Sequence, residues 1–165
     1  MYVTATDLLD GTLKVFSKGP LIWPILASAA VPGMFTPVKI NDRYYIDGGT
    51  LNNFPVDLLK MFCNPLIGIY VNPLGNEKFE NLKHSYSIVE RAYQIKATYE
   101  SQPKFKDCDL FIHPENMSQY TMFSTKNAEA IFDLGYEAAN EALKNSDIKE
   151  KIRDWATKYE AMVKQ

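Results

Sequence analysis

Arg43-Tyr44-Tyr45-Ile46-Asp47-Gly48-Gly49-Thr50 is the stretch of this sequence that carries most information about its fold. A run of strand-forming residues ends at Asp47, and two glycines follow it at once. Such a sequence presents one carboxylate at a tight, exposed turn, where glycines let a substrate or another side chain approach closely. The same pattern is also typical of a purely structural Asp-Gly turn, so this motif alone does not define a site.

Turn-forming sequences surround the Asp47 stretch on both sides. Upstream lies Ala27-Ser28-Ala29-Ala30-Val31-Pro32-Gly33-Met34-Phe35-Thr36-Pro37-Val38, and downstream lies Leu51-Asn52-Asn53-Phe54-Pro55-Val56. Residues 38–40 and 44–46, separated by a polar loop, predict a hairpin with Asp47 at its far end. Residues 27–56 are therefore interpreted as a functional site around Asp47 rather than as part of a packed core.

Predicted strands and helices alternate along the rest of the chain. The predicted strands are residues 2–6, followed by a turn over 7–11, then 66–71 and 110–112. The predicted helices are residues 21–30, 55–60, 82–100 with an apolar stripe of Ile88, Ala92, Ile95 and Tyr99, a helix capped by Asn127, and a last helix capped by Ser146. In the helix after Asn127, Gly135 is expected to allow close approach to a sheet. This alternation predicts an α/β domain with a largely parallel sheet and no internal boundary.

The bulk composition excludes several functional classes. A net charge of −2 without a Lys/Arg block gives no footprint for nucleic acid. The longest apolar run, residues 21–31, is too short to span a bilayer, which takes roughly 18 to 20 residues. Two distant cysteines, Cys63 and Cys108, and the lack of an export signal predict a cytoplasmic protein. The last helix could make the protein peripheral to a membrane, although docking on its own domain is the favoured interpretation.

Taken together, the three segments around Asp47 resemble the patatin-like phospholipase family. The order and spacing of the matching residues carry this resemblance, which covers roughly the first third of the chain: Ser28, Pro32, Phe35, Pro37, Asp47, Gly48, Gly49, Asn53 and Pro55. The resemblance implies a three-layer α/β/α sandwich and hydrolysis of lipid acyl esters by a Ser-Asp dyad without histidine. Asp47 then matches the catalytic aspartate, and Gly48 and Gly49 form the turn that supports it. The resemblance implies no metal and no organic cofactor.

Two other parts of the family's machinery are absent from this sequence. The family's nucleophile lies in G-x-S-x-G and its oxyanion hole in an earlier glycine-rich turn, and neither motif occurs here. Ser28 is better explained by helix packing, and Ser101 and Ser146 by helix ends. We therefore expect residues 1–165 to be the C-terminal part of a single patatin-like domain, and so a partial sandwich. Such a chain would be inactive alone and would need an N-terminal half in cis or in trans.

The lipid or acyl-ester substrate implied by the resemblance needs an apolar site. Leu21, Trp23, Met34 and Phe35, together with Ile22, could line an acyl-chain pocket, although ordinary core packing explains them equally well. His84 and His113 have no carboxylate or thiol at metal-ligand spacing, so structural or surface roles are expected for both.

Two alternatives remain open at this point. The chain could be a non-catalytic scaffold or interaction module that keeps the fold, in which case exposed sheet surface would make it oligomeric or bound to a partner. It could also be an unrelated enzyme with two carboxylates, such as a glycosidase, but Asp42 and Asp57 do not clearly converge on Asp47.

Overall fold

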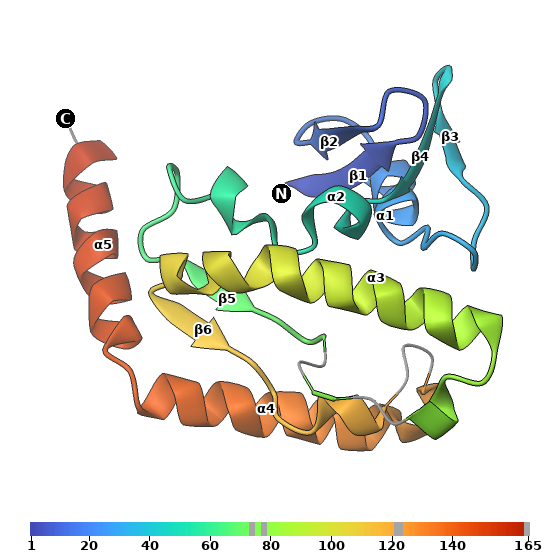
Figure 1. Cartoon of the computed structure of the whole chain (residues 1–165). Coiled ribbons are helices and arrows are strands. Elements are labelled where there is room, and N and C mark those ends of the chain that lie inside the picture. The colour runs from blue at the N-terminus through green and yellow to red at the C-terminus, as the bar shows by residue number, and fades with distance from the viewer. Residues whose placement is uncertain (73–74, 77–78, 121–123, 164–165) are drawn as a thin grey trace. The chain divides into compact units, whose positions relative to one another are not determined.

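The computed structural model describes residues 1–72, 75–76, 79–120 and 124–163. The chain forms two compact units (Figure 1). Unit 1 consists of Met1–Pro55 with Ile95–Ser101, and unit 2 consists of Val56–Gln94 with Gln102–Gln165. Each unit has its own small sheet and its own apolar cluster, so each is described by itself.

Unit 1 contains a four-stranded sheet. Its strands are β1 (Val3–Asp7), β2 (Thr12–Phe16), β3 (Val38–Ile40) and β4 (Arg43–Asp47), arranged in the order β2-β1-β4-β3. All three pairings are antiparallel. The expectation of a largely parallel sheet is therefore wrong for this unit, because strands joined by short turns can only return alongside themselves. The hairpin that ends at Asp47 is confirmed, whereas β2 was not predicted.

One helix covers one face of this sheet. Helix α1 (Ile22–Ser28) buries Pro24 and Ala27 and contacts β1, β3 and β4. Ala27 packs with Ala5 and Tyr45, and the cluster also includes Phe16, Val38 and Ile40. The register shows why these side chains meet, since alternate residues on paired strands share a face. The helix predicted over 21–30 is confirmed, and Pro24 lies in its first turn, where its missing N–H costs little.

The short helix α2 and the last residues of helix α3 complete unit 1. Helix α2 (Gly49–Asn52) follows β4 directly, where the sequence predicted a turn. Helix α3 (Ser85–Ser101) is confirmed, and its residues 95–101 belong to unit 1. The buried residues of α3 are Ala97 and Ser101, and the predicted stripe that includes Ile88, Ile95 and Tyr99 is exposed. Small residues decide the buried face here because they permit close packing.

Unit 2 contains a parallel pair of strands. Strands β5 (Ile67–Ile69) and β6 (Leu110–Ile112) pair in parallel, as the sequence predicted for this part of the chain. Helices α4 (Ala128–Lys144) and α5 (Ile148–Val163) follow, and Leu110, Ile112 and Ile148 form a buried cluster with apolar residues of α4. Short 3-10 helices connect the elements at Pro55–Leu58, Phe79–Asn81, Gln102–Asp107, Met117–Gln119 and Thr125–Asn127. The fold is thus mixed helix and strand, with one antiparallel and one parallel sheet.

Two details at the ends of α4 and α5 differ from prediction. Asn127 does precede α4, but its side chain makes no capping hydrogen bond. Helix α5 begins one residue later than expected: the backbone carbonyl of Asp147 accepts its first hydrogen bonds, and the buried Ser146 hydroxyl has no partner in the part of the chain that the structure describes. A Cβ at Gly135 would meet nothing within 4 Å, so this glycine does not serve close packing.

The carboxylate of Asp109 joins three elements of unit 2. Its Oδ2 accepts a hydrogen bond from the Leu66 N–H at 2.8 Å, and its Oδ1 lies 3.4 Å from the Lys151 ammonium. The Leu66 hydrogen bond is the main cause that lowers the pKa of Asp109. One side chain therefore fixes the start of β5, the start of β6 and the first turn of α5.

Candidate functional site

The main chain of Asp47 is anchored on two sides at the end of β4. Its N–H donates a hydrogen bond to the carbonyl oxygen of Ala30 at 3.0 Å, in the segment that follows α1. Its carbonyl oxygen accepts a hydrogen bond at 3.0 Å from the hydroxyl of Thr6, a buried residue of β1. Asp47 therefore joins the end of the β3–β4 hairpin to the segment after α1 and to β1, which are distant from it in sequence.

The carboxylate of Asp47 is oriented by the first turn of α2. Its Oδ1 accepts a hydrogen bond from the Gly49 N–H at 2.9 Å. The side chain is half-buried and lies on the same face of the sheet as Ala5, its cross-strand partner, whose side chain is fully buried. A carboxylate held in this way has the fixed position that a proton acceptor needs.

Gly48 brings β1 and the start of α2 into direct contact. Its φ of −63° and ψ of −27° are ordinary helical values, so no left-handed backbone requires a glycine here. The requirement is steric: a Cβ on Gly48 would lie 2.5 Å from Thr4 Oγ1, 2.6 Å from the Thr4 carbonyl oxygen and 2.7 Å from its carbon. The sequence predicted a tight, exposed turn whose glycines let a substrate or another side chain approach closely, and in the structure Gly48 permits close approach of β1.

The four residues predicted for an acyl-chain pocket lie directly before α1 (Leu21), on it (Trp23) and after it (Met34 and Phe35). All four are exposed, and the exposed fractions of Trp23 and Phe35 are 56% and 54%. Of the four, Trp23 lines a hollow of about 380 Å³. Its other walls come from the end of β2, the following loop and the tip of the β3–β4 hairpin: Phe16, Lys18, Pro20, Pro24, Lys39, Ile40 and Asn41.

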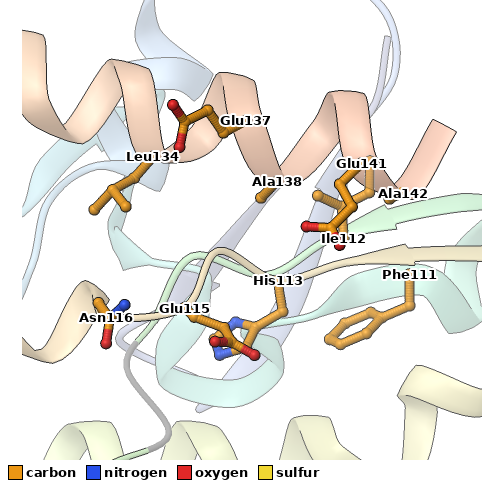
Figure 2. A pocket seen from close by; sticks show the side chains of 10 residues that line it. All are labelled: Phe111, Ile112, His113, Glu115, Asn116, Leu134, Glu137, Ala138, Glu141 and Ala142. Carbon is orange, nitrogen blue, oxygen red and sulfur yellow. The ribbon is translucent and has the colours of Figure 1, made fainter. Parts of the chain in front are cut away.

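A second hollow, of about 390 Å³, lies in unit 2 between α4 and the end of β6 (Figure 2). Helix α4 contributes Glu137 and Glu141, which are one turn apart, and the chain after β6 contributes His113 and Glu115. The Nδ1 atom of His113 lies 2.8 Å from the carbonyl oxygen of Tyr70.

Sequence reasoning missed this second hollow. Two glutamates four residues apart on one helix, and a His-x-Glu pair directly after a predicted strand, are the signals that point to it. The carboxylates give it an acidic lining, yet within residues 1–72, 75–76, 79–120 and 124–163 no group of three or more His, Cys, Asp or Glu side chains could hold a metal ion.

A further structural finding concerns membranes. Among the residues that the structure describes, no helix combines the length and the apolar character needed to cross a bilayer.

The strands and turns around Asp47 lie in a segment that matches a known protein family. Residues 3–60 match the family model of the patatin-like phospholipases. This match includes β1 to β4, α1, α2 and the whole Asp47 site. The resemblance inferred from the sequence is therefore confirmed, and the matched part of this chain is patatin-like.

Individual relatives match part of the chain. An uncharacterized NTE family protein of Mycobacterium tuberculosis is 44% identical over 52 residues, which is 32% of this chain and 14% of that protein. A probable lipid hydrolase of Invertebrate iridescent virus 6 is 49% identical over 37 residues, or 22% of this chain and 13% of that protein. A second mycobacterial NTE family protein, from Mycobacterium bovis, is 28% identical over 58 residues, or 35% of this chain and 10% of that protein. The matched segment thus spans about a seventh or less of the curated relatives.

Proposed function

We propose that this chain provides the catalytic base of a serine hydrolase that cleaves lipid acyl esters, and that Asp47 is this base. The observation that carries the proposal is the fixed carboxylate of Asp47, anchored through Ala30, Thr6 and Gly49 within a patatin-like segment. A relative named as a probable lipid hydrolase supports the substrate class.

The proposed chemistry needs a serine that this chain does not supply in a G-x-S-x-G context. In our proposal residues 1–165 are the C-terminal part of one patatin-like domain with a three-layer α/β/α sandwich. Its N-terminal half, in cis or in trans, brings the serine and the oxyanion turn. An isolated chain is then inactive, and Gly48 and Gly49 hold the aspartate in place for the incoming hydroxyl.

Asp47 acts as a general base and then as a general acid in the proposed reaction. Its carboxylate accepts the serine proton while the serine oxygen forms a bond to the acyl carbonyl carbon. The protonated carboxyl group then returns this proton to the leaving alcohol as the ester bond breaks. Water attacks the acyl-enzyme with the same assistance and releases the fatty acid. The side chains of Leu21, Trp23, Met34 and Phe35 are proposed to contact the acyl chain.

The test compares this chain alone with the chain joined to, or mixed with, a nucleophile-bearing N-terminal half. We expect a fluorophosphonate probe to label the combined protein at serine and to leave the isolated chain unlabelled. Asp47→Asn should lower the rate of p-nitrophenyl butyrate hydrolysis by about 10³-fold or more, because the base is lost while its shape is kept. Asp42→Asn, in the exposed tip of the β3–β4 hairpin, is the matched control and should retain activity.

Three results would contradict the proposal. Full activity of Asp47→Asn would remove the aspartate from the mechanism. Labelling of the isolated chain would show that it holds an activated hydroxyl of its own. A folded combined protein that neither hydrolyses esters nor reacts with the probe would favour a non-catalytic scaffold.

A further inference from the structure

The largest exposed side chains of unit 1 gather on α1 and the segment that follows it. We define the α1 patch by these exposed apolar residues: Leu21, Ile22, Trp23, Ile25, Leu26, Met34 and Phe35. Ile22 is 71% exposed, and the buried residues of α1 are Pro24 and Ala27. The helix therefore uses its small residues to pack on the sheet and presents its large apolar ones outward, which is the reverse of ordinary helix packing.

Lysines are the charged residues in the sequence that contains the α1 patch, and one of them, Lys39, pairs with Asp42 at 3.8 Å. Residues 11–41 contain Lys14, Lys18 and Lys39 and no aspartate or glutamate. Lys18 lines the same hollow as Trp23, so a cation adjoins the aromatic centre of the patch. Lys18 makes no salt bridge within the described part of the chain, and the Lys14 ammonium lies over the Phe16 ring, 5.9 Å from its centre.

We propose that the α1 patch docks on an anionic lipid surface. An exposed Trp beside aliphatic side chains suits the boundary between headgroups and acyl chains, because the indole has an apolar body and a polar N–H. Lysines next to such a patch add attraction to anionic headgroups. Helix α1 has 7 residues, so it would lie in the plane of the interface.

The lysines favour an anionic lipid surface over a second copy of this chain as the partner of the α1 patch. A second copy of the same surface would bring two sets of lysines together, and their repulsion opposes association. Helix α5 also exposes a Trp and a Tyr, Trp155 and Tyr159, stacked with ring centres 5.2 Å apart. In its sequence Arg153 and Lys158 stand beside Asp154 and Glu160, so the charges around this aromatic pair are mixed and add little net attraction to an anionic surface. The two tryptophans thus report on two different surfaces.

The test measures binding of the full chain to vesicles by co-sedimentation and by Trp emission. Vesicles of phosphatidylcholine are compared with vesicles in which about a third of the lipid is phosphatidylglycerol. Trp155→Phe leaves Trp23 as the reporter, and Trp23→Phe leaves Trp155. We expect Trp23 emission to shift to the blue with the anionic vesicles and to reverse at high salt, and Trp155 emission to stay unchanged.

Matched variants separate the apolar and the electrostatic contributions. Ile22→Ser should weaken binding by about tenfold, whereas Ile88→Ser, at an exposed isoleucine of α3, should not. Lys18→Gln should weaken binding by about fivefold, whereas Lys126→Gln, an equal charge change in unit 2, should not. Far-UV circular dichroism verifies that each variant remains folded.

Each alternative outcome overturns the proposal. No binding to anionic vesicles would exclude a lipid surface, and equal binding to neutral vesicles would exclude the charge argument. A blue shift at Trp155 instead of Trp23 would place the contact on α5. A Trp23 shift that grows with protein concentration in the absence of vesicles would assign the patch to a second copy. None of these results depends on ester hydrolysis, so they test the α1 patch separately from the role of Asp47 as catalytic base.

Discussion

Replacing Gly48 with alanine is the most direct perturbation of the Asp47 site. The change adds one methyl group between β4 and α2 and removes no hydrogen bond. Its Cβ would lie 2.5 to 2.7 Å from three atoms of Thr4, where ordinary contacts begin at 3.4 Å. Two of the three atoms belong to the backbone of β1, so rotation of a side chain cannot relieve the contact.

The magnitude follows from two opposing effects. Separating these atoms to normal contact requires β1 and the start of α2 to move apart by about 0.7 to 0.9 Å. Overpacking of this kind costs about 1–3 kcal/mol, and a rigid backbone neighbour places Gly48→Ala near the upper end. Alanine also restricts the unfolded chain, which offsets about 0.4–1 kcal/mol. We therefore expect Gly48→Ala to lower the free energy of unfolding by about 2 kcal/mol.

Urea unfolding followed by far-UV circular dichroism measures this loss, and hydrogen exchange of the β1 and β4 amides locates it. Gly135→Ala is the matched control: this glycine also has helical neighbours, but its Cβ would meet nothing within 4 Å. Gly135→Ala should stabilise the protein by up to about 1 kcal/mol. Adding Thr4→Ala to Gly48→Ala should restore only part of the loss, because the Thr4 carbonyl group stays in place.

Two outcomes would refute this reasoning. Wild-type stability in Gly48→Ala would show that β1 and α2 separate freely, so that Gly48 does not fix the site. Complete rescue by Thr4→Ala would show that only the threonine hydroxyl was in contact.

Three further predictions concern unit 2. Hydrogen bonding to Leu66 lowers the pKa of Asp109, so the stability it contributes is present above its unfolded pKa and is lost as pH falls through its folded pKa. Asp109→Asn should cost about 1 kcal/mol at neutral pH, and in acid unfolding titrations the difference from wild type should begin to shrink at about pH 4 and disappear only below the lowered pKa of folded Asp109; a constant difference would contradict this. Ser146→Ala should leave thermal stability unchanged or raise it, because the buried hydroxyl is unpaired, whereas a helix cap would lose about 1 kcal/mol. Burial and neighbouring carboxylates raise the pKa of the Cys108 thiol, so mass spectrometry should find iodoacetamide on exposed Cys63 first and on Cys108 only at more alkaline pH; equal rates at neutral pH would argue against burial of Cys108.

Local sequence signals predicted the elements that local forces determine. The hairpin before Asp47, helix α1 with Pro24 in its first turn, and strands β5 and β6 all have turn residues or apolar runs that define them. The motif spacing also identified the patatin-like segment, since the match over residues 3–60 contains every element of the Asp47 site.

Contacts between distant residues set the features that the sequence did not predict. β2 has a lysine at its centre and only partly buried neighbours, so its alternation is weak until it pairs with β1. The exposed apolar stripe of α3 and the burial of Ala97 and Ser101 depend on which face meets the rest of unit 1. The role of Gly48 depends on Thr4, which is 44 positions away and has no signature near the glycine.

The restraints on Asp47 have an evolutionary consequence. The peptide groups of Ala30 and Gly49 hold Asp47 by hydrogen bonds that do not depend on the side chains of those two residues, and Thr6 adds a hydroxyl. Any residue type at position 30 presents the same carbonyl oxygen, so the surroundings can drift while the acid keeps its location. A graft of this segment would therefore have to reproduce the path of the chain at positions 30 and 49, whereas the residue type at position 30 could vary.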